Sequence, residues 1–295
     1  MSFKSKKIDV CIPTWNSGRT LSHCLRSIVK EIPVNRILIA DNFSTDETLH
    51  VAREFQAVII QQKCGIGKAR QMLIDEVSTD FFAFIDSDVV LREGWFKAIM
   101  KVMESDARIG AVCGLWFSDN PQDRHYWEIW WRRVRLDDPI WKRGYLIDTM
   151  IRTQAVKGIS IPDKLNNYED KFIREFITSR GYKWIPAKNA TSDHLVGEAE
   201  FWKTILGRRI YGAGLRRWKD VDPNATIRKL LSDGLREPVL STYTALKSKD
   251  PIIFPYRFLN FLFILIGYLS SGEKMTFEME KDKIYKKQFS KYLRE

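Results

Sequence analysis

Residues 81–88 have the sequence Phe-Phe-Ala-Phe-Ile-Asp-Ser-Asp, an apolar run that ends abruptly at two acids separated by one serine. A short apolar run bounded by a turn is typical of a strand buried on both faces of a sheet. Three similar runs precede it, at 8–12, 37–40 and 58–60. Stretches with apolar residues at helical spacing separate the runs, at 21–29, 49–55 and 67–77. This alternation predicts an α/β domain with a mostly parallel sheet flanked by helices on both faces.

Polar clusters follow three of these predicted strands. They are Pro13-Thr14-Trp15-Asn16, Asp41-Asn42 and Asp86-Ser87-Asp88. Ligands of open α/β sheets bind beyond the carboxyl ends of the strands, so these polar groups are expected where a nucleotide would bind. Asp86 and Asp88 could share a hard divalent cation such as Mg²⁺ or Mn²⁺, which prefers oxygen ligands and bridges to phosphates. The alternative is that two acids after a strand are ordinary turn residues.

Further local signals extend the pattern along the chain. Ser44-Thr45-Asp46-Glu47 resembles a capping box at the start of the second helix. Downstream, a helix is expected at 94–104, a strand at 111–115, a helix at 169–180 that stops at Gly181, and a strand at 182–185. Aromatic residues accumulate between 116 and 145. They would form either an acceptor platform or an aromatic core beneath an insert.

Charge is unevenly distributed over the 295 residues. The chain has a formal net charge of +11, and residues 200–295 contain 19 Lys and Arg against 11 Asp and Glu. A basic C-terminal third favours contact with anionic lipid, phosphate or nucleic acid, and a solvated basic surface is the alternative. Because no nucleic-acid recognition module accompanies the charge, no nucleic-acid partner is expected.

The cysteines and the N-terminus indicate a reducing compartment. Cys11, Cys24, Cys64 and Cys113 match neither a zinc ribbon nor a small disulfide scaffold, and three of them fall in apolar runs. A polar start that passes directly into a strand is not a signal peptide. A cytoplasmic location is therefore expected.

The last third contains one strongly apolar stretch, 251–270. Its core, Phe258–Leu269, has twelve residues, too few for a helix that crosses a bilayer, and extension toward Pro251 adds Arg257. With basic residues around it, this stretch is expected to lie at the cytoplasmic face of a membrane as an interfacial helix. A short membrane span and a buried core helix are the alternatives.

Four motifs in order resemble the nucleotide-sugar half of family 2 glycosyltransferases, which have the GT-A fold. These are Pro13-Thr14-Trp15-Asn16, Asp41-Asn42-Phe43-Ser44-Thr45-Asp46, the segment 63–71, and Phe84-Ile85-Asp86-Ser87-Asp88. The family usually has asparagine where Lys63 and Gln71 stand. The resemblance implies that Pro13, Thr14 and Asn16 lie beside the nucleotide. It further implies that Asp41 accepts a hydrogen bond from the base, most often uracil, and that Arg70 faces the donor's phosphates or sugar.

The same resemblance implies the metal site and the catalytic base. Asp86 would bind the ribose side and the metal, Asp88 the metal, and His194 would complete the ligand set for Mg²⁺ or Mn²⁺. Tyr168-Glu169-Asp170 resembles the family's Glu-Asp motif, which makes Asp170 the general base. Physically, an inverting transfer needs a carboxylate opposite the leaving diphosphate to take the acceptor's proton. The alternative is that both acids only favour a helix N-terminus.

Taken together, these patterns predict a GT-A catalytic domain at 1–205 and a basic, partly apolar helical C-terminal region at 206–295. The nucleotide-sugar half would span about 1–115 and the acceptor half about 116–205. The expected reaction moves a sugar from a nucleotide sugar, most often a UDP-sugar, to a lipid-linked or growing glycan. Alternatives are a nucleotidyltransferase, which the Glu-Asp motif disfavours, and an inactive sugar- or nucleotide-binding protein. A dinucleotide site at Gly65 fails because Arg70 replaces the third glycine of the fingerprint.

Overall fold

The computed structural model describes residues 6–118, 144–163, 165, 167–195, 212–216, 226–248, 251 and 253–270. The chain divides into two compact units. The first unit comprises Met1–Asp163 and Glu169–Gly197, and the second comprises Lys164–Tyr168 and Glu198–Glu295.

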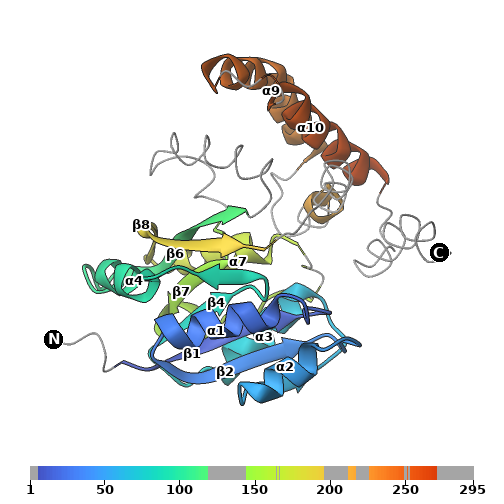
Figure 1. The fold of residues 1–295 in the computed structure, drawn as a ribbon. Helices are drawn as coiled ribbons and strands as arrows, with labels where there is room; N and C mark the ends of the chain where they lie inside the picture. Colours follow the sequence, from blue (N-terminus) through green and yellow to red (C-terminus); the bar gives the residue numbers. More distant parts are fainter. Residues whose placement is uncertain are drawn as a thin grey trace. The chain divides into compact units, whose positions relative to one another are not determined.

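The first unit is built on one mixed sheet (Figure 1). Its strands are β1 (Ile8–Thr14), β2 (Val34–Asp41), β3 (Val58–Gln61), β4 (Phe81–Ile85), β5 (Val89–Leu91), β6 (Ile109–Ser118), β7 (Asp148–Arg152) and β8 (Lys183–His194). Within the described residues they form an eight-stranded sheet in the order β3-β2-β1-β4-β7-β6-β8-β5. The pairs among β3, β2, β1 and β4 are parallel, as is the pair β6 and β8. The predicted mostly parallel sheet flanked by helices is confirmed.

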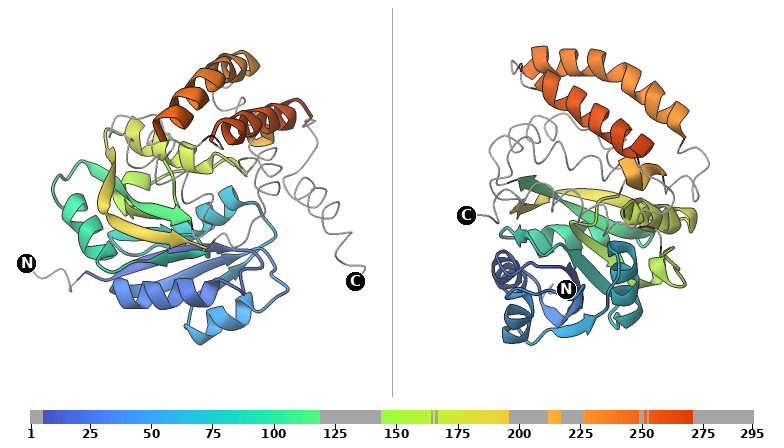
Figure 2. Two further views of the ribbon diagram at one scale, coloured as in Figure 1. Left: turned by 45° about the horizontal axis from the view of Figure 1, so that its top comes forward. Right: turned by 90° about the vertical axis from the view of Figure 1, so that its right-hand side faces the viewer.

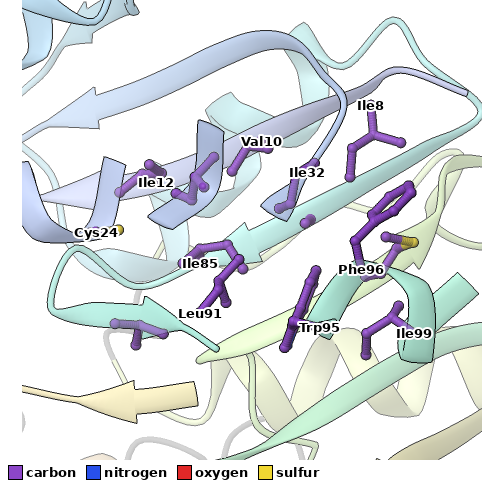
Figure 3. Packing of buried hydrophobic residues seen from close by; sticks show 14 of the residues in the cluster. Ile8, Val10, Ile12, Cys24, Ile32, Ile85, Leu91, Trp95, Phe96 and Ile99 are labelled. Carbon is purple, nitrogen blue, oxygen red and sulfur yellow. The ribbon is translucent and has the colours of Figure 1, made fainter. Parts of the chain in front are cut away.

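Helices cover both faces of this sheet, because β1 is apolar on both sides (Figure 2). Ile8, Val10 and Ile12 pack in one cluster with α1 (Leu21–Glu31), α2 (Thr48–Glu54) and α4 (Trp95–Met103). Figure 3 shows side chains of β1 and of α4 in this cluster. Cys11, which points to the opposite face, packs in a second cluster with α3 (Ile66–Glu76), α6 (Thr153–Val156) and α7 (Glu169–Ser179).

Antiparallel pairing was not anticipated from the sequence. β7 runs antiparallel to both β4 and β6, and β5 runs antiparallel to β8. Neither β5 nor β7 was predicted. β5 has three residues, and β7 begins with a charged residue, Asp148, so neither presents a long apolar run. β8 also continues to His194, well beyond the predicted end at 185.

The predicted capping box at Ser44 is wrong. Helix α2 begins at Thr48, and the N–H and hydroxyl groups of Ser44 donate to Asp41 instead. The Asp46 carboxylate accepts hydrogen bonds from the N–H groups of Gly18 and Thr48. The polar residues after β2 therefore fasten the loop after β1, and do not cap a helix at Ser44. The stop at Gly181 is confirmed, since this glycine has a φ of 82° just after α7.

The second unit contains α9 (Ile227–Ser248), α10 (Ile253–Ser270) and a helical segment at 212–216. Helices α9 and α10 pack closely, because a Cβ atom at Gly234 would overlap the ring of Phe261. Arg216 Nη1 donates to the carbonyl of Tyr268, 3.3 Å away, near the end of α10. None of the described helices combines the length and the apolar character needed to cross a bilayer.

Most of the aromatic stretch between 116 and 145 lies outside the described residues. Of its members, Trp116 is buried in β6 and pairs with Ser192 of β8. The proposal that this stretch forms an acceptor platform stays a prediction.

Candidate active site

The carboxyl ends of β1, β2 and β3 are aligned in register. Thr14 is paired with Asp41, and Asp41 with Gln61. The Asp41 carboxylate is buried and accepts hydrogen bonds from the Thr14 hydroxyl (3.0 Å), the Ser44 N–H (2.9 Å) and hydroxyl (2.5 Å), and the Gln61 amide (3.2 Å). Both carboxylate oxygens are thus occupied, and Asp41 organises the edge of the sheet at which it was predicted to meet a base.

Two loops at this edge are joined through Asn16. Its N–H donates to the hydroxyl of Ser44 (2.8 Å), and its side-chain oxygen accepts from the N–H of Thr45 (2.9 Å). Asn16 has a φ of 50°, in the left-handed region that asparagine tolerates better than most residues. Pro13 lies inside β1, buried and paired with Ala40. The loop after β1 is therefore held in a defined conformation by the loop after β2.

Arg70 lies buried on α3 and joins two acidic motifs. Its Nη2 is 3.1 Å from Asp86 Oδ1, and its Nε is 3.2 Å from Glu169 Oε1. Nη1 donates to the carbonyl of Leu146, and the guanidinium stacks over the ring of Phe84 at 5.0 Å. The predicted contact of Arg70 with the sugar donor stays a prediction. Within the protein, its N–H groups lie against acceptors of both acidic motifs and of Leu146.

Asp86 and Asp88 occupy the turn between β4 and β5. Burial raises the pKa of Asp86 to about 6, although the Arg70 charge opposes this shift. Burial also raises the pKa of Asp88, but the neighbouring His194 outweighs it, so the net pKa lies below the ordinary value. His194 Nε2 is 3.2 Å from Asp88 Oδ1 at the end of β8. The structure thus brings Asp88 and His194 together, while Asp86 contacts Arg70.

Asp170 is buried at the first turn of α7, directly after Glu169. Its Oδ1 accepts a hydrogen bond from the Lys171 N–H (2.7 Å). The preceding residue, Tyr168, has a φ of 71°, which is uncommon for a bulky side chain. Backbone conformations of this kind cluster at functional sites, because surrounding contacts must maintain them. Through Glu169 and Arg70, the start of α7 is connected to Asp86.

Asp148 is a further acid at this site that the sequence analysis missed. It is 2% exposed at the start of β7, and its Oδ2 accepts hydrogen bonds from the Ser192 hydroxyl (2.8 Å) and the Trp95 indole (3.2 Å). Burial raises its pKa to about 7, and the charge of Asp86 adds to this. A Cβ at Gly114 would overlap the same carboxylate. The signal in the sequence was a lone acid after two apolar residues, Leu146 and Ile147.

The side chains of Asp86, Asp88 and His194 supply only part of the ligands that a hard divalent cation needs. Asp88 and His194 offer one oxygen and one nitrogen, which Mn²⁺ accepts. Asp86 adds an oxygen only if it shares its carboxylate between Arg70 and the cation. Across the part of the chain that the structure describes, no three His, Cys, Asp or Glu side chains are grouped closely enough to hold a metal ion. Two protein ligands with oxygens of a bound diphosphate would match how Mg²⁺ and Mn²⁺ are commonly held.

Solved structures share this fold. The chain is similar to a mannosyltransferase, PcManGT from Pyrobaculum calidifontis, solved with GDP-Man and Mn²⁺ (14% identity, TM-score 0.65, covering 92% of this chain and 89% of that one). It is also similar to residues 1–349 of S. aureus TarS in complex with UDP (16% identity, TM-score 0.51, covering 90% of each chain). The likeness concerns the fold alone, and the predicted GT-A architecture is confirmed.

Curated relatives match part of the sequence. The glycosyltransferase GlyA of Streptococcus pneumoniae is 25% identical over 167 residues, which cover 52% of this chain and 23% of the relative. GlyG of the same organism is 26% identical over 132 residues, covering 42% and 43%. The chain therefore spans less than half of the length of these relatives. The sequence model described as glycosyl transferase family 2 matches residues 9–163. Because this match covers more than half of the chain, the protein belongs to glycosyl transferase family 2.

Proposed function

We propose that this protein transfers a sugar from a nucleotide-sugar donor to an acceptor hydroxyl with inversion, and that Asp170 is the general base. The observation that carries the proposal is the contact chain Asp86–Arg70–Glu169, which fastens the acidic turn after β4 to the start of α7. Inverting transfer needs both segments in one site. The acidic turn would lie beside the leaving diphosphate, and the start of α7, with Asp170, beside the acceptor.

The donor would bind at the aligned ends of β1, β2 and β4. Thr14, Asn16 and the buried Asp41 support the nucleotide side, since their hydrogen bonds hold both loops in place. A base N–H that donates to Asp41 would replace the Gln61 amide, whose 3.2 Å bond is the longest of the four. The solved relatives carry UDP or GDP-Man, so both uridine and guanosine donors belong in a test.

Asp88 and His194 would hold Mg²⁺ or Mn²⁺ against the donor's diphosphate, with Asp86 at the ribose and the cation. When bound, the cation neutralises charge that accumulates on the departing diphosphate. Arg70, which is itself buried, holds Asp86 in place.

In the transfer step, the acceptor oxygen forms a bond to the anomeric carbon while the bond from that carbon to the diphosphate oxygen breaks. The bonding electron pair leaves with the diphosphate, and the hydroxyl proton passes to the Asp170 carboxylate. Asp170 lies in the first turn of α7, directly after Glu169 of the contact chain. The proposed acceptor is a lipid-linked or growing glycan at the cytoplasmic face of a membrane.

The test begins with the donor. Thermal shift with UDP-GlcNAc, UDP-glucose and GDP-mannose, each with and without Mn²⁺, identifies the nucleotide sugar that stabilises the protein. Release of nucleoside diphosphate is then measured with a panel of glycan and lipid-linked acceptors. Asp170→Asn should lower transfer by about 10²–10⁴-fold while donor binding is retained. Asp88→Ala should abolish the Mn²⁺-dependent part of donor stabilisation.

Asp163→Asn is the matched control, because it makes the same chemical change at an exposed carboxylate, which forms an ion pair with Lys68 (3.6 Å). It should leave both transfer and donor binding unchanged. Wild-type turnover by Asp170→Asn would disprove the base assignment. Donor stabilisation by Mn²⁺ that survives Asp88→Ala would disprove the metal assignment.

A further inference from the structure

One side of α9 exposes a stripe of apolar residues in the second unit. Its members recur every three or four residues and share one side of the helix. The α9 stripe consists of Ile227, Leu231, Leu235, Val239, Tyr243 and Leu246. Leu235 is 81% exposed, Leu246 75% and Val239 71%, although such side chains are normally among the most buried.

The opposite side of α9 makes the contact with α10. Leu230 is buried, and Gly234 lies so close to Phe261 of α10 that a larger residue would overlap its ring. Residues 259–268 of α10 are half-buried or buried. The core of the apolar stretch that the sequence marked for a membrane is therefore partly buried in the folded chain. The α9 stripe, which the sequence analysis overlooked, is the more exposed surface.

Basic residues outnumber acidic ones on α9. Its sequence contains Arg228, Lys229, Arg236 and Lys247 against Asp233 and Glu237, and Arg228 and Arg236 are exposed. Residues 200–295 as a whole carry a net charge of +8. An apolar stripe with arginines beside it suits a bilayer surface rich in anionic lipid, where acyl chains receive the apolar groups and headgroups receive the cations.

We propose that the α9 stripe docks this protein onto an anionic membrane surface, with α9 lying in the plane of the interface and α10 supporting it from behind. A second copy of the chain is a poorer occupant, because a symmetric contact would bring Arg228 and Arg236 of both copies to the same positively charged interface. This docking would place the proposed enzyme next to a membrane-bound acceptor. The docking proposal rests on the proposed function only for the location of that acceptor. Membrane binding itself needs neither donor nor acceptor.

The experiment measures co-sedimentation of the full chain with vesicles, without nucleotide sugar. Vesicles of phosphatidylcholine alone are compared with vesicles that contain about 30% phosphatidylglycerol, at about 0.1 M and about 0.5 M salt. We expect binding to the anionic vesicles that weakens at the higher salt. Leu235→Glu/Val239→Glu should lower the vesicle partition coefficient by at least about tenfold, because it places two charges on the side of α9 that would enter the bilayer.

Arg228→Glu/Arg236→Glu keeps the stripe and should remove the salt-dependent part of binding. Val29→Glu makes the same kind of change at an exposed apolar residue of α1 in the first unit, and should bind as the wild type does. All three variants should melt like the wild type, since only exposed side chains change. Donor stabilisation is measured in parallel, so that loss of vesicle binding with retained donor binding separates this proposal from the proposed function.

Two results would overturn the proposal. One is equal binding of wild type and Leu235→Glu/Val239→Glu to anionic vesicles. The other is a dimer of the wild type in light scattering without lipid that the same variant converts to a monomer, which would identify a second copy as the occupant.

Discussion

The buried position of Arg70 predicts a large and pH-dependent loss of stability when its charge is removed. At an effective dielectric constant of about 20, an ion pair at 3.1 Å is worth roughly 5 kcal/mol before desolvation is subtracted. Arg70 has two such partners, Asp86 and Glu169, and its own side chain is 5% exposed. Removing one member of a buried pair typically costs about 3–5 kcal/mol, because the remaining charge stays buried without its counter-ion. We expect Arg70→Met to fall in this range.

The assay is urea unfolding followed by tryptophan fluorescence, in which such a loss lowers the midpoint by roughly 1–2 M. Arg70 lowers the pKa of Asp86, so Arg70→Met raises it further above about 6. The stability deficit is therefore complete above that raised pKa and shrinks as the pH falls through it, because a protonated carboxyl needs no cation. The deficit at about pH 5 should be smaller than the deficit at about pH 8.

Lys68→Met is the control, since Lys68 lies on the same helix and forms an exposed ion pair with Asp163. Exposed pairs contribute about 0–1 kcal/mol, so this variant should stay close to the wild type. An Arg70→Met protein within about 1 kcal/mol of Lys68→Met, or with a deficit that does not depend on pH, would refute the role given to the contact chain.

Three further expectations concern the same unit. The pKa of Asp148 is raised to about 7, so the folded protein keeps a proton that the unfolded chain releases near 3.8. Wild-type stability should then fall as the pH rises between these values, by up to about 1.4 kcal/mol per pH unit, and Asp148→Asn should flatten that slope in urea titrations. Gly114→Ala should cost about 1–3 kcal/mol by the same measurement, because its Cβ would overlap the Asp148 carboxylate; an unchanged midpoint would contradict the close contact. Gly181→Ala should cost only about 1 kcal/mol, since its φ of 82° is unfavourable for alanine but nothing lies within 4 Å of the added atom; a loss as large as that of Gly114→Ala would contradict this.

Helix and strand order in the first unit could be predicted because the signal is local. The runs at 8–12 and 81–85 are buried on both faces, and the helices between them repeat their apolar residues at 3.6-residue spacing. β5 and β7 could not be found in this way, because a three-residue strand and a strand that begins with Asp148 carry too little apolar pattern. The α9 stripe was also missed, because its exposure depends on which side of α9 meets α10.

By itself, the sequence determined the α/β architecture, the family, and the residue types at each strand end. Motifs and apolar periodicity are local patterns, so they can be recognised from residues close together in the chain. Only the tertiary structure decided which charges meet. Arg70 contacts Asp86 sixteen positions away and Glu169 ninety-nine positions away, and no local pattern encodes either distance. The raised pKa of Asp148 has the same origin. Burial and the charge of Asp86 raise it, the hydrogen bonds from Ser192 and Trp95 oppose this, and these residues come from separate parts of the chain. Burial and charge pairing are properties of packed neighbours, so they are settled only when the chain folds.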